Sequence, residues 1–313
     1  MASPKESKSP KSPASAKSPP KSPSPRTASS PAAENQLTDV IEVDADDASS
    51  LAPSSILNYK WENGRRYHAY EDGSYWFVPH RSRPATYMRE FADETPGAQV
   101  IGVDLSAIQP PFVPPNCSFE IDDVNKEWTY PDDNFDFIHV RAMTGCVNDW
   151  VDFYKKVYQH LKPGGWVHQI ELSAVAKSDD GTIKPDSPLV TWVEVFEKMS
   201  AAMGKSFFAC ETARESVEAT GRFINVHERR LKLPIGTWPK DKKLKQWGAW
   251  NRQFLLQGLE GFSIRGLTTM LGWTYEETQM FLVQMRRELT DPSIHTYIDM
   301  CVVYAQKPIE SEE

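Results

Sequence analysis

Residues 97–106 read GAQVIGVDLS, and the fold class of this 313-residue chain is best approached from this stretch. The run 99–103 has the short apolar pattern of a buried strand, and it ends on one carboxylate, Asp104. In nucleotide-binding α/β folds, a carboxylate at the carboxyl end of a strand accepts hydrogen bonds from both ribose hydroxyls. Alone, the stretch is weak evidence for a nucleotide-binding fold. The segments that follow it provide the stronger evidence.

Strand and helix patterns alternate on both sides of this stretch. The patterns predict a helix at 84–93, strands at 117–121 and 135–140, a helix at 148–161 and a strand at 166–172. Asn148 is the expected N-cap of the second helix, and the Lys-Pro-Gly-Gly sequence at 162–165 is expected to end it. The connections are short enough for right-handed crossovers, so we expect an α/β fold with one doubly wound parallel sheet.

The last third of the chain continues the mixed pattern. We expect helices at 188–203, 211–220, 244–259 and 275–289, and strands at 223–233 and 300–306.

Three of the expected strands end on polar residues. Asp104 closes the first strand, Asp122 and Asp123 follow the second, and Arg141 lies at the exit of the third. Because the carboxyl ends of parallel strands face one crevice, these groups are expected to converge on one ligand. A ribose at Asp104 and an adenine edge at Asp123 and the Val124 backbone would use them well.

Composition excludes several classes of protein. No apolar run approaches the roughly 20 residues of a membrane span, and the N-terminus lacks the apolar region of a signal peptide. The four cysteines show no CxxC spacing and the seven histidines are isolated, so we expect reduced thiols and no metal site. The net charge of −8 divides into +5 over residues 1–30 and −13 over the rest, which argues against a nucleic-acid groove on the folded part.

Residues 1–53 are expected to form a disordered tail that precedes a folded domain at 54–313. Ten serines and eight prolines stand in 1–31, with Ser-Pro steps that resemble proline-directed kinase sites. The following segment, 34–47, carries a net charge of −6 around Val40, Ile41 and Val43. This pattern resembles a SUMO-interacting motif, in which a β-branched segment adds a strand to the partner's sheet.

Taken together, the motifs resemble class I S-adenosylmethionine-dependent methyltransferases, within them the fungal LaeA-like group of secondary-metabolism regulators. The matching segments are YHAYEDGSYW at 67–76, VIGVDLS at 100–106, FEIDD at 119–123, FDFIHVR at 135–141 and LKPGGW at 161–166. The likeness covers roughly residues 55–308. It implies a Rossmann-like methyltransferase sheet, with Asp104 at the ribose hydroxyls and Asp123 at the adenine amino group. The residues it implies for cofactor binding are Asp104, Leu105, Asp122, Asp123, Val124, Arg141, Tyr70 and Trp76.

The chain departs from the family at its most diagnostic element. A first strand running into a Gly-x-Gly-x-Gly turn is missing, because the only glycines between residues 60 and 100 are Gly64, Gly73 and Gly97. Side chains would stand where the backbone must approach the cofactor, so we predict S-adenosylmethionine binding that is much weakened or absent. We also expect residues 74–78 to take the empty place of the first strand in an incomplete or rearranged sheet. Two explanations stand: a mispredicted exon boundary or splice variant of a working enzyme, or a true deletion.

The first functional hypothesis is a LaeA-like methyltransferase acting on a small molecule or a protein, in the nucleus or the cytoplasm. The alternative is a non-catalytic nuclear regulatory scaffold that keeps the fold, the tail and the SUMO-binding segment. No catalytic residue is assigned, since His139 and His168 lie on strands, where histidines are more often core or loop residues than bases.

Overall fold

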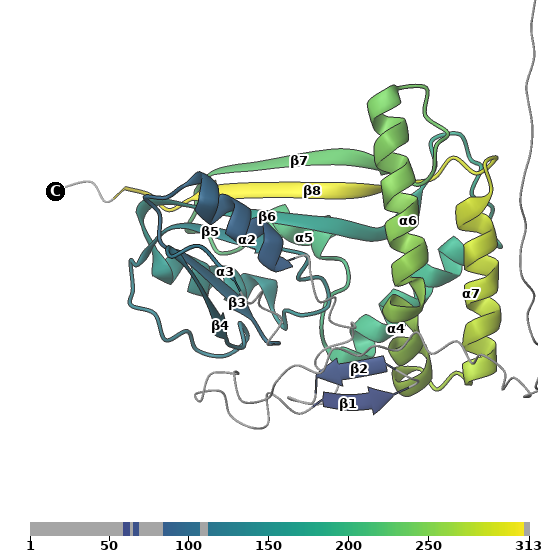
Figure 1. Ribbon diagram of the computed structural model, residues 1–313, viewed down its shortest axis with the longest axis horizontal. Coiled ribbons are helices and arrows are strands. Elements are labelled where there is room, and N and C mark those ends of the chain that lie inside the picture. Colours follow the sequence, from purple (N-terminus) through teal and green to yellow (C-terminus); the bar gives the residue numbers. More distant parts are fainter. Residues whose placement is uncertain (1–58, 63–64, 69–83, 107–111, 310–313) are drawn as a thin grey trace, which may run out of the picture. The chain divides into compact units, whose positions relative to one another are not determined.

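The computed structural model describes residues 59–62, 65–68, 84–106 and 112–309 (Figure 1). The predictions for the tail at 1–53, for the motif with Val40 and Val43, and for Tyr70, residues 74–78 and Trp76 lie outside these residues.

The described elements alternate between strands and helices. In chain order they are β1 (Tyr59–Glu62), β2 (Arg65–His68), α2 (Pro84–Glu94), β3 (Val100–Asp104), β4 (Cys117–Ile121), β5 (Phe135–Arg141), α3 (Trp150–His160), β6 (Leu161–Lys177), α4 (Pro188–Met203), α5 (Ala209–Glu218), β7 (Ile224–Pro234), α6 (Lys242–Arg265), the π-helical turn η2 (Gly266–Met270), α7 (Tyr275–Thr290) and β8 (Tyr297–Gln306). Every strand and helix predicted between residues 84 and 306 is present, with no end shifted by more than six residues.

In the described part of the chain the strands form three sheets. β1 and β2 form an antiparallel hairpin, β3 and β4 form a parallel pair, and the third sheet has the order β5-β6-β8-β7. β5 and β6 run parallel, whereas β8 is antiparallel to both β6 and β7. No described strand pairs with both β3 and β5 and so joins the two parallel pairs, which agrees with the predicted sheet that is incomplete or rearranged at its first strand.

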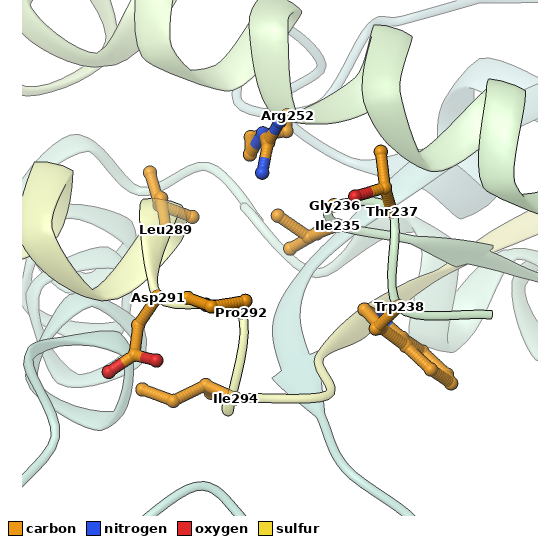
Figure 2. A pocket seen from close by; sticks show the side chains of 9 residues that line it. All are labelled: Ile235, Gly236, Thr237, Trp238, Arg252, Leu289, Asp291, Pro292 and Ile294. Carbon is orange, nitrogen blue, oxygen red and sulfur yellow. The ribbon is translucent and has the colours of Figure 1, made fainter.

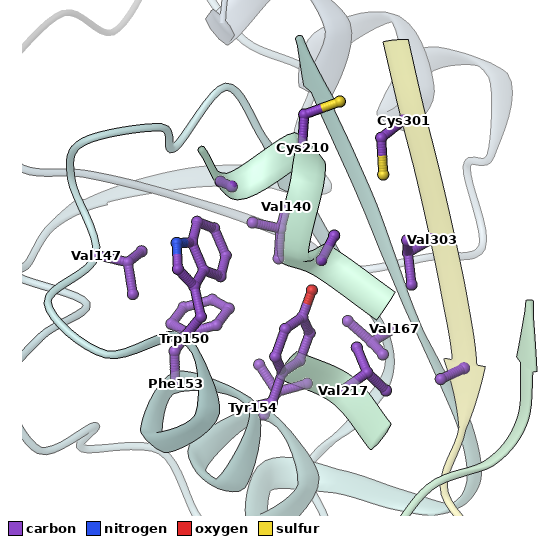
Figure 3. Close-up of a cluster of buried hydrophobic side chains, with 14 of the residues drawn as sticks. Val140, Val147, Trp150, Phe153, Tyr154, Val167, Cys210, Val217, Cys301 and Val303 are labelled. Atoms are coloured by element: carbon purple, nitrogen blue, oxygen red, sulfur yellow. The ribbon is translucent and has the colours of Figure 1, made fainter. Parts of the chain in front are cut away.

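The four-stranded sheet has a hydrophobic cluster on each face, which makes the fold doubly wound. On one face, Val167 of β6 packs with Trp150, Tyr154 and other side chains of α3 and α5 (Figure 3). On the other face, Leu172 of β6 packs with side chains of α4, α6 and α7 such as Leu259. Because successive strand residues point to opposite faces, odd and even positions of β6 serve different clusters. The predicted α/β class is confirmed.

Helix α3 begins one residue later than predicted, because Asp149 and not Asn148 is its N-cap. Oδ1 of Asp149 accepts hydrogen bonds from the backbone N–H of Val151 at 2.8 Å and of Asp152 at 3.0 Å. A carboxylate also interacts favourably with the positive end of the helix dipole. The adjacent Asn148 is instead bonded through its backbone N–H, which donates to Asn125 Oδ1.

Strand β6 is longer than predicted, because the Pro-Gly-Gly sequence continues the strand instead of forming a break before it. Gly164 N donates to the Lys307 carbonyl at 3.0 Å, and Lys307 N donates to the Gly165 carbonyl at 2.9 Å. Gly164 has φ +81°, a conformation that favours glycine. These backbone hydrogen bonds hold an extended path that the local sequence does not suggest.

Close contacts hold β3 against α2 and β4, and ion pairs hold the hairpin β1-β2 to α6. A Cβ on Gly102 of β3 would lie 2.7 Å from Met88 Sδ of α2 and 2.6 Å from Phe119 of β4, so only glycine permits this packing. The hairpin is held to α6 by ion pairs between Arg65 and Glu260 at 2.9 Å and between Glu62 and the buried Arg265 at 3.3 Å. Among the described helices, none is both long enough and apolar enough to cross a membrane.

Candidate functional site at the strand ends

Asp104 is the last residue of β3, and its carboxylate is mostly buried. Oδ1 accepts a hydrogen bond from Ser106 N at 2.8 Å, while Oδ2 has no partner among the described residues. Burial raises the pKa of Asp104, and the hydrogen bond from Ser106 acts in the opposite direction. Leu105, the next residue, is half-buried. Within the described residues, Asp104 therefore has one carboxylate oxygen left to accept a hydrogen bond from a ligand.

The end of β4 forms a tight turn in which the two acidic residues have different partners. In the parallel register Asp104 lies opposite Ile121, and Asp122 N donates to the Asp104 carbonyl at 3.3 Å. Asp123 is 9 % exposed, and its Oδ1 accepts hydrogen bonds from both the backbone and the side chain of Asn125 at 3.0 Å. The Val124 carbonyl is also engaged, because it accepts the indole N–H of Trp128 at 3.2 Å.

Arg141 ends β5 and opens the loop 142–149, which we call the exit loop. The guanidinium of Arg141 lies over the ring of Tyr87 in α2, 4.0 Å from its centroid. The exit loop then turns sharply, with positive φ at Ala142 (+54°) and Gly145 (+72°). Left-handed backbone at a residue with a side chain is unfavourable, so the surrounding contacts must hold this turn.

Glu171 of β6 is the principal anchor of the exit loop. Its side chain is 1 % exposed and accepts Met143 N at 2.8 Å on Oε1, and Thr144 N at 3.3 Å and Thr144 Oγ1 at 2.9 Å on Oε2. Burial raises the pKa of Glu171, while the hydrogen bonds from Met143 and Thr144 act against this shift. A buried carboxylate with three donors fixes the first half of the exit loop.

Asn125 joins the turn after β4 to the exit loop. Its Nδ2 donates to the Cys146 carbonyl at 3.0 Å as well as to Asp123, and its Oδ1 accepts Asn148 N at 2.9 Å. Asp104 lies within electrostatic reach of the same loop. Burial is the main cause that raises the pKa of Cys146 to about 12; the charge of Lys205 opposes this shift, and the charges of Glu171 and Asp104 add to it. The acidic strand ends and the exit loop therefore meet in one region.

His139 and His168, the histidines considered as bases, lie side by side on β5 and β6 and bond to each other. Their Nδ1 atoms are 3.1 Å apart, and Phe137 stacks beside them. Loss of hydration lowers the pKa of His139 to about 4, with His168 and Arg141 lowering it further. Both rings are engaged with each other on a strand face, which is neither the core nor the loop position expected for them.

Two residues of this region, Asn125 and Glu171, are not among those the sequence pointed to. Asn125 connects segments 21 residues apart, and no local pattern announces such a bond. Glu171 carried a usable signal, because alternation along β6 places it on the same buried face as Val167, where a carboxylate must be paired. Tyr70 and Trp76 lie outside the described residues, so their positions relative to Asp104 stay a prediction.

Comparison with known proteins agrees with this arrangement. Residues 84–272, well over half of the chain, match the family model described as a methyltransferase domain. The chain therefore belongs to the methyltransferase family, and the resemblance and the enzyme class predicted from its motifs are confirmed. S-adenosylmethionine is the methyl donor of this family.

Several curated relatives span nearly the same length. Methyltransferase pytC of Aspergillus terreus is 32 % identical over 311 residues, covering 86 % of this chain and 94 % of that protein. The secondary metabolism regulator LAE1 of Cochliobolus heterostrophus is 30 % identical over 299 residues, covering 82 % and 97 %. A solved phosphoethanolamine N-methyltransferase 2 of Haemonchus contortus is 19 % identical, with a TM-score of 0.42, and covers 70 % of this chain and 45 % of that one.

The residues present fit one half of the cofactor. Oδ2 of Asp104, which has no partner among the described residues, can accept a hydrogen bond from a ribose hydroxyl, and the nearly buried carboxylate of Asp123 is an acceptor of the kind that an amino group needs. The methionine half has no counterpart in the sequence, because no glycine turn precedes α2. The acidic strand ends therefore fit the nucleoside of S-adenosylmethionine. The sequence has no glycine turn that would let the backbone approach its sulfonium end.

Proposed function

We propose that the methyl transfer of this chain takes place where β3, β4 and β5 end, with Asp104 and Asp123 holding the nucleoside of S-adenosylmethionine. The observation that carries the proposal is the side chain of Asn125, which bonds both Asp123 and the exit loop and so unites the strand ends in one region. The cofactor supplies an electrophilic methyl group. The residues around it then have to orient the acceptor and exclude water, since methyl transfer depends chiefly on positioning.

The acceptor that suits this region best is one that needs no base. Glu171 is fully engaged with the exit loop, and the pKa values of both His139 and His168 are lowered by burial while the two rings bond each other. A thioether has no proton to lose, so its sulfur can accept a methyl group without general-base help. A relative from Emericella nidulans, 26 % identical over 223 residues and covering 70 % of this chain and 59 % of that protein, is named protein-methionine methyltransferase laeA. We therefore propose a methionine side chain of a protein as acceptor, and a role in regulating secondary metabolism.

Calorimetric titration of S-adenosylhomocysteine into the whole chain tests this function. We expect Asp104→Asn to weaken binding by about tenfold or more, because a neutral amide loses one charge-assisted hydrogen bond. Asp136→Asn is the matched control. Asp136 is an exposed carboxylate of β5, away from the strand end, and it pairs with Lys162 of β6. Equal affinities for the two variants would refute the assignment of Asp104.

The missing glycine turn is tested by insertion. We expect weak binding by the chain as it stands, and stronger binding when a hydrophobic strand followed by Gly-x-Gly-x-Gly is placed between Val78 and Pro84. If neither form binds the cofactor, the non-catalytic scaffold becomes the better account. Micromolar binding without the insertion would show that the glycine turn is dispensable here.

Two finer proposals concern the N-terminal part of the chain. We propose that Val40, Ile41 and Val43 bind SUMO, supported by their acidic flanks, and a titration of a peptide covering 34–50 that shows no shifts would remove the idea. Residence in the nucleus or the cytoplasm is proposed from the basic tail and the family, and a fluorescent fusion in cells tests it.

A further inference from the structure

A pocket lies beside the end of β7 and the start of β8. It is bounded by the loop after β7, by α6, and by the connection from α7 to β8, and its volume is about 90 Å³. On a scale where one water molecule needs about 10–15 Å³, it holds on the order of six waters or one small organic molecule. Its lining residues are Ile235, Gly236, Thr237, Trp238, Arg252, Leu289, Asp291, Pro292 and Ile294 (Figure 2).

One cation points into this pocket. Arg252 extends from α6 toward its centre (Figure 2), and the side chain is half-buried. In the part of the chain that the structure describes, its guanidinium makes no hydrogen bond and no ion pair. A guanidinium removed from water without a partner is costly, which makes such a group a candidate anion-binding residue.

The only carboxylate that lines the pocket is committed to its own loop. Oδ1 of Asp291 accepts Ser293 N at 2.8 Å and Ser293 Oγ at 2.6 Å, and these bonds lower the pKa of Asp291. Figure 2 shows this carboxylate directed away from the centre of the pocket. Arg252 is therefore the charged group that a ligand would meet first.

Part of the remaining wall is formed by apolar side chains whose backbone or ring is held by hydrogen bonds. Ile235 and Leu289 are each 3 % exposed, and Ile235 N donates to the Thr296 carbonyl at 2.8 Å. The indole N–H of Trp238 donates to the same carbonyl at 3.0 Å, which fixes the ring. These bonds mean that the space is built into the fold and is not a gap between loose loops.

The position of Arg252 is fixed by close packing between α6 and the loop after β7. Gly236 N donates to the Gly248 carbonyl at 2.9 Å, and Asn251 Nδ2 donates to the Pro234 carbonyl at 2.9 Å. Gly236 has φ +100°, and a Cβ there would lie 3.8 Å from Arg252 Nη1. The backbone thus passes close to the guanidinium without covering it.

From this geometry we infer that the pocket is a binding site for a small organic carboxylate, with the carboxylate on Arg252 and an apolar group against Ile235 and Leu289. A planar guanidinium bonds a carboxylate through two parallel N–H groups, and the apolar walls gain from burying a short chain or a ring. This site is distinct from the strand ends at Asp104, and it does not depend on methyl transfer.

Benzoate is the test ligand, followed by NMR of the Ile235 and Ile294 methyl groups in the whole chain. We expect benzoate to shift these methyls, and benzamide, which has the same shape without the charge, to bind at least tenfold more weakly. Inorganic phosphate, which lacks an apolar group, is also expected to bind more weakly than benzoate. No shift with benzoate, or equal affinity for benzoate and either of the other two ligands, would overturn the inference.

Two variants at Arg252 test whether its positive charge binds the carboxylate. Arg252→Gln is expected to weaken benzoate binding by about ten- to a hundredfold, and Arg252→Lys to keep part of the affinity. Lys245→Gln is the matched control, because it removes a positive charge from an exposed position of the same helix. An equal loss in Lys245→Gln would show that only the general charge of α6 matters, and would refute a site at Arg252. The comparison of benzoate with benzamide uses the unaltered chain and decides the question even where a variant fails to fold.

Discussion

Replacing Asn125 by alanine removes three hydrogen bonds of its side chain, two of which join the turn after β4 to the exit loop. Two are donated by Nδ2, to Asp123 Oδ1 and the Cys146 carbonyl at 3.0 Å each, and one is accepted from Asn148 N at 2.9 Å. Each bond in such a half-buried place is worth about 1 kcal/mol net, and the partners it leaves can be only partly rehydrated. We therefore expect Asn125→Ala to lower the free energy of unfolding by about 2–3 kcal/mol.

The assay is urea denaturation followed by circular dichroism, together with the rate at which Cys146 reacts with a thiol reagent. Cys117, Cys210 and Cys301 are buried, so early reaction reports the loosening of the exit loop at Cys146. Asn148→Ala is the control, because it keeps the backbone N–H that bonds Asn125 and removes only an exposed side chain. It should change stability by less than about 0.5 kcal/mol. The reasoning fails if the two variants have equal stability, or if Asn125→Ala leaves the reactivity of Cys146 unchanged.

Two further predictions concern packing and pH. A Cβ on Gly248 would lie 2.0 Å from the Gly236 carbonyl oxygen, so Gly248→Ala should cost about 3 kcal/mol or more in urea denaturation despite the better helix propensity of alanine. Gly97→Ala, where nothing lies within 4 Å, should be nearly neutral, and equal effects would contradict the packing argument. His139 should titrate near pH 4 in NMR spectra, below the ordinary histidine pKa of 6.5. The unfolded chain then binds a proton at His139 more readily than the folded chain does. The free energy of unfolding should therefore fall as the pH drops from 6.5 toward 4. His168→Ala should raise the pKa of His139, and titration of His139 near 6.5 in the unaltered chain would show that the ring is not dehydrated.

Local sequence was sufficient for the elements themselves and for the residues at the strand ends. Apolar alternation and Gly-Pro punctuation placed β3, β4 and β5, and Asp104 lies at the end of β3 as the pattern predicted. Boundaries were less predictable where distant segments decide them. The continuation of β6 through Gly164 depends on Lys307, which lies more than 140 residues away in the chain.

Residues that act through long-range bonds could not be read from the sequence. Asn125 owes its role to two segments brought together by the fold, and the choice of Asp149 over Asn148 as helix cap follows from the same contact. The antiparallel pairing of β8 with β6 and β7 was not predicted, because pairing between strands depends on which neighbours are available and not on the pattern of any one strand. Glu171 is the exception, since a carboxylate on a buried strand face signals a partner in advance.

The length of β6 has a consequence for how the folded part of the chain unfolds. This one strand supplies Val167 to the cluster around Tyr154 and Leu172 to the cluster around Leu259, on opposite faces of the sheet. Neither cluster can be lost without releasing a strand on which the other depends, so the two should melt in a single cooperative transition. A truncation that ends within β6 would therefore leave no independently stable fragment, and amide hydrogens on both sides of Ile170 should exchange at the same global rate.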